Sequence, residues 1–391
     1  MNCRFNAFIF KSDNAESLTL MHALIPYMKR GYLMKKKNIW AGLSLCLMLV
    51  AAGCGNNNAA NTENAANAGN SPATTTNAPA NAGAGDAKSY KIAISQYVEH
   101  PSLDATREGF LAALKDAGIV EGENLKVDLE NAQADQANNL SIAQKIAGDK
   151  NDLVLGIATP SAQAVVQNVK DTPILFAAVT DPLDAKIVTD LEHPGGNVSG
   201  ASDTNPEAIT RLMNFIATQF PNVKKLGLVI NEGEPNAVVM ADIAKEELDK
   251  HGIELVKAAI TNTSEVKQAA GSLVGRVDAF YITLDNSVVS GVDAIIQTAN
   301  DNKIPFFSAD RDTVEKGAFA TVGFKYYDHG YQVGEMAVEV LKNGTSPGEM
   351  KVTMQEKLDL ILNLKAAAAQ GIEVTDAMKA EVADQSSNII Q

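Results

Sequence analysis

Residues 90–118, YKIAISQYVEHPSLDATREGFLAALKDAG, decide the fold. They begin with the apolar run Lys91–Ser95, which is typical of a buried strand, and continue with apolar residues at helical spacing from Pro101 to Ala117. Gly118 stands where a helix commonly ends. A strand followed directly by an amphipathic helix is the repeating unit of a parallel sheet that carries helices on both faces.

The same unit recurs along the chain in two series, which predicts two similar lobes. In the first series we expect strands at 125–129, 153–157, 174–178 and 198–201, and helices at 134–147, 161–169 and 183–191. In the second we expect strands at 225–230, 253–259, 279–283 and 305–308, and helices at 206–219, 236–250, 264–275 and 288–301. The C-terminal part has predicted strands at 319–322, 351–354 and 361–364 and a helix at 326–342. Lobe 1 would comprise 89–204 plus about 322–345, and lobe 2 would comprise 205–321 plus about 346–391.

The first 88 residues have the features of an export signal followed by a flexible tether. Lysines after Met34 precede an apolar run of about 14 residues, too short to span a membrane and typical of a secretory signal. Ala51-Ala52-Gly53-Cys54 resembles a bacterial lipobox, so we expect cleavage before Cys54 and a diacylglycerol anchor on its thiol. Residues 1–33 would then be an upstream extension, with Met34 as the true start. The alternative is a core helix with an incidental cysteine.

Composition, net charge and cysteine positions exclude several classes of protein. Residues 54–88 are rich in Asn and Ala and should form a disordered tether. A formal net charge of −14 argues against binding to nucleic acid, which requires a basic face. Of the three cysteines, Cys3 and Cys46 precede the expected cleavage site, so a disulfide framework is excluded.

Polar residues cluster just after the predicted strands, where open α/β sheets bind ligands. A hydroxyl that opens a helix there can seat a carboxylate, and a facing carboxylate can hold an ammonium. Each residue also has an ordinary alternative as a helix N-cap, and a lone histidine in a loop is often only solvated. Tyr326 and Tyr327 begin an amphipathic helix and fit packing at least as well. The candidate ligand-binding residues are Tyr97, Glu99, His100, Thr159, Ser161, Ala178, Thr180, Asp181, Asp203, Asn236, Asp285, Asn286 and Asp310.

Several motifs resemble one known family. They are Ile94–Pro101 followed by Leu103-Asp104 and Arg107–Phe110, then Gly156–Gln163, Val179–Pro182, Pro194–Gly200 and Leu362–Ala367. Over residues 90–380 the chain is similar to the ABC-transporter substrate-binding lipoproteins of the tryptophan-binding TrpX type. The resemblance implies a type I periplasmic-binding-protein fold, with two Rossmann-like lobes, a three-segment hinge and a closing cleft.

The resemblance also implies a function and roles for single residues. The loops Thr159–Ser161 and Ala178–Thr180 would hold the carboxylate of an amino acid, with Asp285 on its ammonium. The protein would capture a small solute, with aromatic amino acids such as tryptophan favoured, and deliver it to an ABC permease and its ATPase. We expect a monomer outside the cell membrane, held there through its lipid anchor only, without cofactor or metal.

Other classes of function fit the sequence less well. The sequence lacks a P-loop and the GxSxG, CxxC and HExxH motifs, so we do not expect an enzyme. A sensor lipoprotein that feeds a receptor stays open, as does a binder of a solute other than an amino acid. An exported chain without a basic helix-turn-helix is not a sugar-responsive repressor.

Overall fold

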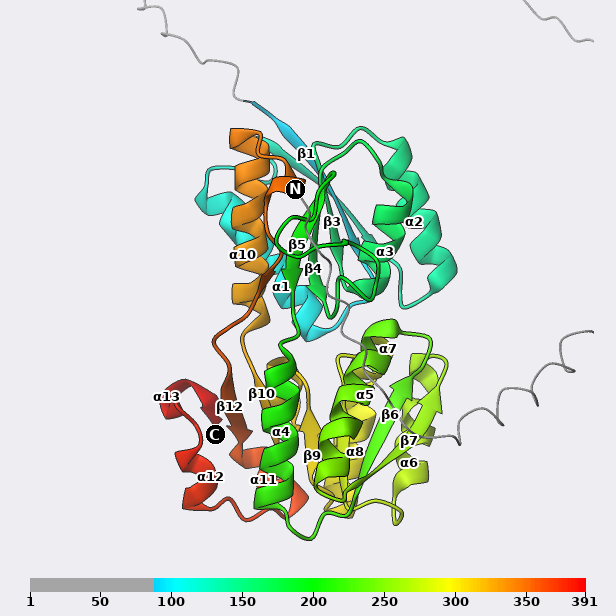
Figure 1. The fold of residues 1–391 in the computed structure, drawn as a ribbon, viewed down its shortest axis with the longest axis vertical. Helices are drawn as coiled ribbons and strands as arrows, with labels where there is room; N and C mark the ends of the chain where they lie inside the picture. The colour runs from blue at the N-terminus through cyan, green and yellow to red at the C-terminus, as the bar shows by residue number, and fades with distance from the viewer. Residues whose placement is uncertain (1–87) are drawn as a thin grey trace, which may run out of the picture. The chain divides into compact units, whose positions relative to one another are not determined.

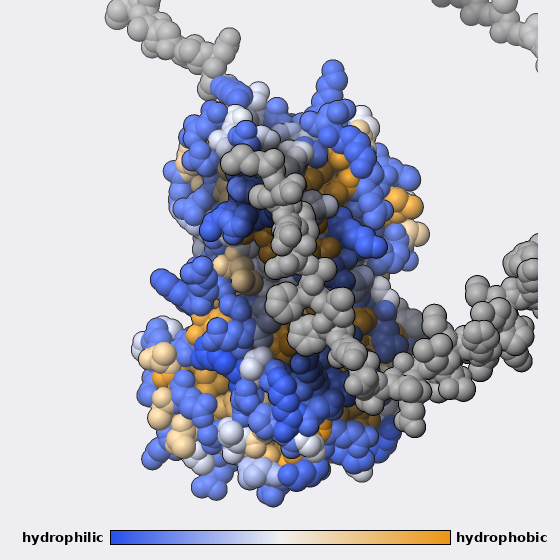
Figure 2. All heavy atoms as spheres, in the orientation of Figure 1, coloured by the Kyte–Doolittle hydropathy of each residue, from blue (hydrophilic) through white to orange (hydrophobic). Residues whose placement is uncertain are grey.

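The computed structural model describes residues 88–391, which lie within one compact unit made of two lobes (Figure 1). The predicted start, signal, lipidated Cys54 and nearly all of the tether lie outside the described residues. Within residues 88–391, no helix is long and apolar enough to cross a membrane. On the face that Figure 2 shows, both lobes are mainly hydrophilic, with smaller apolar areas between.

Lobe 1 is built on a parallel sheet of strand order β11-β5-β4-β3-β1-β2. Its strands are β1 (Tyr90–Gln96), β2 (Leu125–Asn131), β3 (Leu153–Ile157), β4 (Ile174–Val179), β5 (Val198–Ser202) and β11 (Thr353–Met354). Its helices are α1 (Pro101–Asp116), α2 (Gln136–Gly148), α3 (Thr159–Asn168) and α10 (Tyr326–Val338), the last continued by a wider turn over Glu339–Asn343. Strands β3 and β4 are buried at every residue, as a sheet covered on both faces requires.

Lobe 2 is built on a sheet of order β13-β12-β10-β9-β8-β6-β7, in which only the β10–β12 pairing is antiparallel. Its strands are β6 (Lys225–Asn231), β7 (Glu254–Ile260), β8 (Ala279–Ile282), β9 (Phe306–Ser308), β10 (Ala320–Gly323), β12 (Asp359–Asn363) and β13 (Ile389–Ile390). Its longer helices are α4 (Pro206–Gln219), α5 (Pro235–Lys250), α6 (Val266–Leu273) and α8 (Val292–Asn302). Its shorter helices are α7 (Asn286–Ser290), α9 (Arg311–Lys316), α11 (Leu364–Gln370), α12 (Asp376–Ala380) and α13 (Gln385–Asn388).

The predicted α/β fold with two lobes is confirmed, but the predicted helix at 183–191 is wrong. Residues 181–191 form turns, because the Asp181 carboxylate accepts the N–H groups of Leu183 and Asp184 and Lys186 adopts a left-handed φ of 57°. A residue with positive φ cannot continue a right-handed helix. Helix α9 was not predicted, and the predicted helix 288–301 is interrupted at Gly291 between α7 and α8.

Helix α10 crosses back to lobe 1 and packs closely on α1. A Cβ added at Gly109 would lie 2.0 Å from the Tyr327 carbonyl oxygen, and one at Gly330 would lie 1.9 Å from the Thr106 carbonyl oxygen. Glycine is therefore required at both positions for the helices to approach this closely. The packing places the first turn of α10, which begins at Tyr326, beside the ends of β4 and β5.

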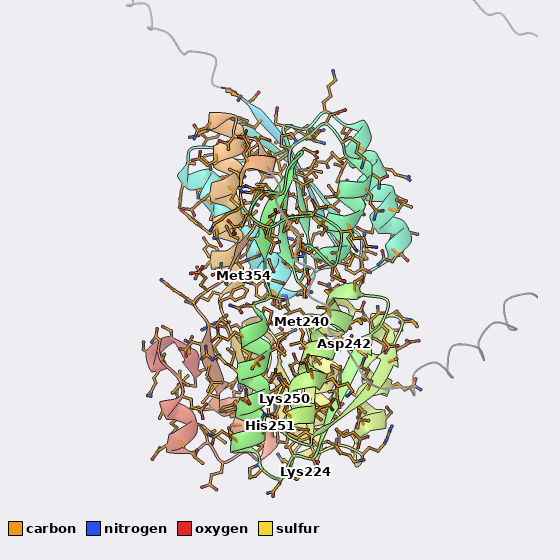
Figure 3. The ribbon with its side chains drawn as sticks, viewed as in Figure 1. Lys224, Met240, Asp242, Lys250, His251 and Met354 are labelled. Carbon is orange, nitrogen blue, oxygen red and sulfur yellow. The ribbon has the colours of Figure 1, made fainter. Side chains whose placement is uncertain are left out.

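Three segments connect the lobes and form the hinge (Figure 1). They are 203–205 after β5, 324–325 after β10, and 355–358 between β11 and β12. The third crossing comes later than the expected boundary near 346, because β11 pairs with β5 in lobe 1. Figure 3 shows Met354 beside the junction of the lobes, and Lys224, which precedes β6, at the far end of lobe 2. The carboxyl ends of the lobe 2 strands therefore face lobe 1.

Candidate ligand-binding site

A cavity lies between the two lobes at the carboxyl ends of their strands. Its lining atoms surround about 310 Å³ of space. Ser102 of lobe 1 bonds to Asp310 of lobe 2 across it, and His100 bonds to Asn286, so the lobes are closed on each other. The lining residues of this interlobe cavity are His100, Ser102, Leu103, Ala178, Thr180, Asp203, Asn236, Leu284, Asn286, Val289, Asp310 and Tyr326.

Asp310 is the carboxylate that joins the lobes. It follows β9, is 2% exposed, and accepts a hydrogen bond of 3.0 Å from the Ser102 hydroxyl of lobe 1. Within lobe 2 it accepts the Thr313 N–H at 2.7 Å, which caps α9, and the Ser308 hydroxyl at 3.0 Å. Burial and the Asp310 charge raise the pKa of the neighbouring Asp312 to about 7. A buried carboxylate of this kind is a strong partner for a cationic group.

A second contact between the lobes leaves an acceptor unpaired. The Asn286 side-chain amide donates to Glu234 at 2.6 Å, so its oxygen, 3.3 Å from His100 Nε2, is the acceptor and His100 Nε2 carries the proton. Burial lowers the pKa of His100, which keeps the ring neutral. Its Nδ1 is then a bare acceptor, buried and without a hydrogen-bond partner among residues 88–391.

Asn236 presents a similar acceptor from lobe 2. Its amide nitrogen donates to the Leu284 carbonyl at 2.7 Å and to Glu234 at 3.2 Å. Its Oδ1 is buried and has no partner in the described part of the chain. The interlobe cavity therefore combines a buried carboxylate, Asp310, with two unpaired neutral acceptors, and such a set is suited to an ammonium group.

Glu234 does not line the cavity, but it holds two lining residues, Asn236 and Asn286, in place through hydrogen bonds. The carboxylate is 1% exposed and accepts from the N–H and side-chain amide of Asn286, from the N–H and hydroxyl of Ser287, and from Asn236. It thereby closes the first turn of α7. Our sequence reasoning left Glu234 out of the candidate residues, although its place after β6 carried the same signal as the residues chosen.

Asp285, the expected ammonium partner, does not line the interlobe cavity. It is fully buried as the N-cap of α7, and its two oxygens accept the N–H groups of Asn231 and Val288. Burial and the Glu234 charge raise the pKa of Asp285 well above its usual range. Its hydrogen bonds are those of a side chain that supports the β8–α7 turn.

Asp203 lies in the first hinge segment and lines the interlobe cavity there. The carboxylate accepts the Tyr326 hydroxyl at 3.0 Å, the Thr204 hydroxyl at 3.1 Å and the Thr180 hydroxyl at 3.4 Å. Burial nevertheless raises the pKa of Asp203 to about 6. Tyr326, for which the sequence favoured packing as strongly as binding, thus contributes its hydroxyl to the hinge and lines the cavity.

Of the other predicted residues of lobe 1, Ala178 lines the cavity, whereas Thr159 and Ser161 do not. Thr159 Oγ1 accepts the Thr180 N–H at 3.3 Å, and the Ser161 hydroxyl donates to Asn139 at 3.0 Å. Ala178 lines the cavity with a left-handed φ of 54°, and its N–H donates to His329 Nε2 at 3.0 Å.

Three further predicted residues make no contact with the cavity. Tyr97 is buried, and its hydroxyl bonds to the Ala134 carbonyl and to Gln136. Glu99 is exposed, and Asp181 serves the turn described above.

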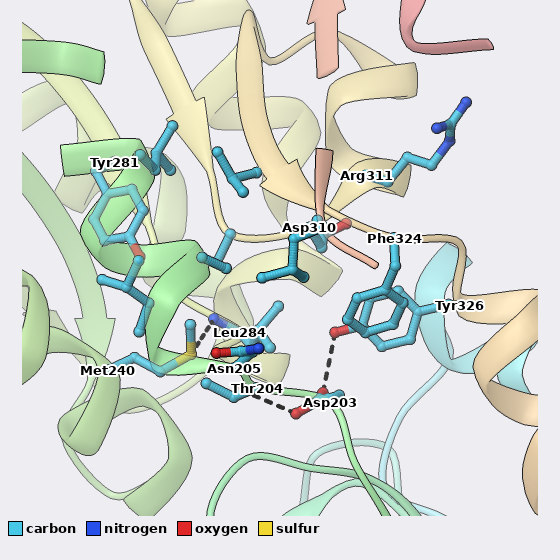
Figure 4. Close-up of a pocket in the computed structure, with 17 residues that line it drawn as sticks. Asp203, Thr204, Asn205, Met240, Tyr281, Leu284, Asp310, Arg311, Phe324 and Tyr326 are labelled. Carbon is cyan, nitrogen blue, oxygen red and sulfur yellow. Dashed lines mark hydrogen bonds between the residues drawn. The ribbon is translucent and has the colours of Figure 1, made fainter. Parts of the chain in front are cut away.

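A second cavity adjoins the first inside lobe 2 (Figure 4). Its lining atoms surround about 430 Å³ of space, and Asp203, Leu284, Asp310 and Tyr326 border both cavities. Its wall is mainly apolar. The remaining lining residues of this lobe 2 cavity are Thr204, Asn205, Ala208, Ile209, Leu212, Met240, Tyr281, Ala309, Arg311, Val322, Gly323, Phe324 and Leu358.

Most residues that line the lobe 2 cavity do not follow a strand, so the search for polar residues at strand ends could not predict them. Met240 and Leu212 lie within helices, and Tyr281 lies within β8. An apolar residue in such an element is indistinguishable in sequence from ordinary core. No group of three or more His, Cys, Asp or Glu side chains within residues 88–391 is arranged to hold a metal.

Comparisons with known proteins bear on this site. The family model for ABC transporter substrate binding proteins matches residues 91–386. The tyrosine-binding protein of Clostridioides difficile is 43% identical over 279 residues, 71% of this chain and 80% of that protein. A domain from Streptococcus pneumonia solved in complex with L-Trp is 31% identical, with 78% of this chain and all of that chain covered and a TM-score of 0.72.

A related protein solved in an open state superposes less well on this chain. The ligand-free, open substrate-binding protein from Clostridium difficile is 42% identical over 77% of this chain and 98% of that chain, but has a TM-score of only 0.56. The complex with L-Trp is less identical and superposes better, so the lobes here are not arranged as in the open structure. Leucine- and inositol-binding proteins of low identity share the fold alone, which is that of type I periplasmic-binding proteins.

Proposed function

Because this chain belongs to the ABC transporter substrate-binding proteins, a solute-binding and extracytoplasmic family rather than an enzyme family, we propose that it captures an aromatic amino acid between its lobes. One observation carries the proposal: a buried carboxylate and two unpaired acceptors stand next to an apolar cavity. The names of the tyrosine-binding relative and of the complex with L-Trp support the same ligand class.

The ligand's ammonium would bind among Asp310, His100 Nδ1 and Asn236 Oδ1. Asp310 supplies the opposite charge, and the two neutral acceptors complete the three hydrogen bonds that an ammonium donates. We assign the ammonium to Asp310 in preference to Asp285, because Asp310 borders the cavity and both Asp285 oxygens accept backbone N–H groups.

The ligand's carboxylate would lie toward lobe 1. The Ser102 hydroxyl, which now donates to Asp310, becomes free to turn to the ligand once the ammonium occupies Asp310. Thr180 lines the same side. Thr159 and Ser161 would support these loops through Thr180 and Asn139.

Binding would proceed by closure about the three hinge segments. A ligand that touches both lobes favours the closed state, because only that state makes all of its contacts. The permease of an ABC importer and its ATPase would then receive the ligand. We further propose a lipid anchor at Cys54 followed by the tether 54–88, and a monomeric protein.

Calorimetric titration of the wild-type protein with L-tyrosine, L-tryptophan and L-phenylalanine tests the proposal. We expect saturable binding of at least the first two, and a rise in melting temperature with ligand concentration. The sole tryptophan is Trp40, so a protein that begins at Cys54 has no indole emission of its own. Binding of L-tryptophan can therefore be measured directly from the fluorescence of the ligand. A melting temperature that no aromatic amino acid raises would refute the ligand class.

Asp310→Asn should lower the affinity for L-tyrosine by about 100-fold, since it removes the buried partner of the ammonium. Asp181→Asn is the matched control, because Asp181 also follows a strand and accepts backbone N–H groups but lies outside the interlobe cavity. We expect it to change the affinity by less than about threefold. Equal losses in the two variants would contradict the placement of the ammonium.

A further inference from the structure

The hydroxyl of Tyr281 is a buried polar group without a structural role. Tyr281 lies in β8, is 0% exposed, and its Oη has no hydrogen-bond partner within residues 88–391. A hydroxyl left unpaired in an apolar interior destabilises the folded state. A folded protein that keeps such a group needs a reason for it.

Tyr281 lines the lobe 2 cavity opposite the hinge. Figure 4 shows it across the cavity from Phe324 and Tyr326, with its hydroxyl on the side of Met240. The other polar side chains that line this cavity are satisfied. Thr204 and Tyr326 donate to Asp203, Asn205 caps α4, and Arg311 bonds to Glu315, Asn388 and Ser387. In the described chain, Tyr281 is thus the one residue of this wall whose side chain holds a buried oxygen or nitrogen without a hydrogen-bond partner.

The lobe 2 cavity begins where the proposed ammonium site ends. Asp310, Leu284 and Tyr326 border both cavities, so the side chain of a ligand anchored at Asp310 can extend into lobe 2. The wall there suits a flat apolar ring, with the Phe324 and Tyr326 rings 5.1 Å apart on one side and aliphatic side chains with Met240 on the others.

We propose that Tyr281 is a specificity-determining residue whose hydroxyl hydrogen-bonds the polar atom on the ligand's aromatic ring. The inference rests on the proposed function, and it narrows the ligand class to aromatic amino acids that carry a ring hydroxyl or a ring N–H. The hydroxyl accepts from the N–H of an indole, and it either accepts from or donates to a phenol. A benzyl side chain would leave it unpaired.

The preference among ligands follows from the same physics. A site that holds a hydrogen-bonding group for its ligand discriminates against an analogue that lacks the matching group, because the site's own group then stays unpaired. The wild-type protein should therefore bind L-tyrosine and L-tryptophan about tenfold more tightly than L-phenylalanine. It should discriminate equally against p-methyl-L-phenylalanine, which has nearly the size of tyrosine without the hydroxyl.

The test is calorimetric titration of wild type and Tyr281→Phe with L-tyrosine, L-tryptophan and L-phenylalanine. We expect the variant to bind the first two about tenfold more weakly and L-phenylalanine within about twofold of wild type. Tyr331→Phe is the matched control, since the Tyr331 hydroxyl bonds to Asp116 on the outer face of lobe 1. This control should leave all three affinities unchanged.

The outcomes separate this inference from the proposed function. Wild type that binds all the aromatic ligands, p-methyl-L-phenylalanine included, with equal affinity overturns the role of Tyr281 and leaves the proposed function standing. Equal losses for all three amino acids in Tyr281→Phe overturn it as well, because they point to packing or to a trapped water. Absence of binding by any aromatic amino acid overturns both. The comparison of L-tyrosine with p-methyl-L-phenylalanine in wild type decides the matter even if Tyr281→Phe does not fold.

Discussion

The two lobes position their cavity loops by opposite means. In lobe 1 a neutral imidazole, His329, accepts the N–H of Ala178 and holds that residue in a left-handed conformation. In lobe 2 a buried carboxylate, Glu234, accepts from the first turn of α7 and from Asn236. One loop is therefore anchored by a group that must remain uncharged, and the other by an acceptor surrounded by donors.

The difference extends to what each lobe offers a ligand. The strand-end hydroxyls of Thr159 and Ser161 in lobe 1 are used within lobe 1 itself. Lobe 2 provides Asp310, the unpaired oxygen of Asn236 and the apolar cavity. We infer that lobe 2 supplies the charged partner of the ammonium and the cavity for the ring, while lobe 1 contributes His100 and the hydroxyls of Ser102 and Thr180. The comparison predicts that substitutions in the two lobes have separable effects.

The largest effect on stability should come from Glu234→Gln. The substitution places an amide N–H₂ among side-chain and backbone donors that now point at a carboxylate oxygen, which leaves several of them unsatisfied. We expect the free energy of unfolding to fall by about 3 kcal/mol, as measured by denaturant titration.

Glu232→Gln is the matched control for this variant. Within residues 88–391, Glu232 makes only an exposed contact of 3.9 Å with Lys257, so its loss should cost less than about 0.5 kcal/mol. If the two substitutions destabilise the protein equally, Glu234 does not anchor the lobe 2 loop.

A smaller effect, which depends on pH, should come from His329 in lobe 1. Burial lowers the pKa of His329 from 6.5 to about 4, so the folded protein resists protonation that the unfolded chain accepts. The contribution of His329 is therefore intact above pH 6.5 and is lost as the pH falls from 6.5 to 4. The shift corresponds to about 3 kcal/mol at its full extent, reached only near pH 4.

The difference between wild type and His329→Gln isolates this contribution. A glutamine does not titrate, and its oxygen can accept the Ala178 N–H in place of Nε2. The variant should lose less stability than wild type between pH 6.5 and 4 in thermal melts. Asp203 acts in the opposite direction, since its raised pKa makes the folded protein relatively more stable as the pH falls from about 6 to 3.8, but it does so in both proteins. Parallel pH profiles for the two proteins would show that His329 is not the neutral anchor.

From the sequence, we predicted which residues lie at strand ends more accurately than which of their side chains face the cavity. Alternating strands and helices located both sheets, and the strand-end rule found His100, Asn236, Asn286 and Asp310, which line the interlobe cavity. The same rule selected Ser161 and Asp285, because a strand-end position does not tell whether a side chain faces the ligand or bonds to its own lobe. Tyr281 and Met240 had no such signal, since they lie inside a strand and a helix.

The smallest predicted effect tests that distinction directly. Ser161 is fully buried and donates to Asn139, whose own amide donates to the Pro160 carbonyl. Ser161→Ala should therefore cost about 1 kcal/mol of stability, the value of one neutral hydrogen bond, and change the affinity for L-tyrosine by less than twofold. Calorimetry and denaturant titration of the same variant measure the two quantities. A tenfold loss of affinity without loss of stability would contradict this assignment and would place Ser161 in contact with the ligand's carboxylate.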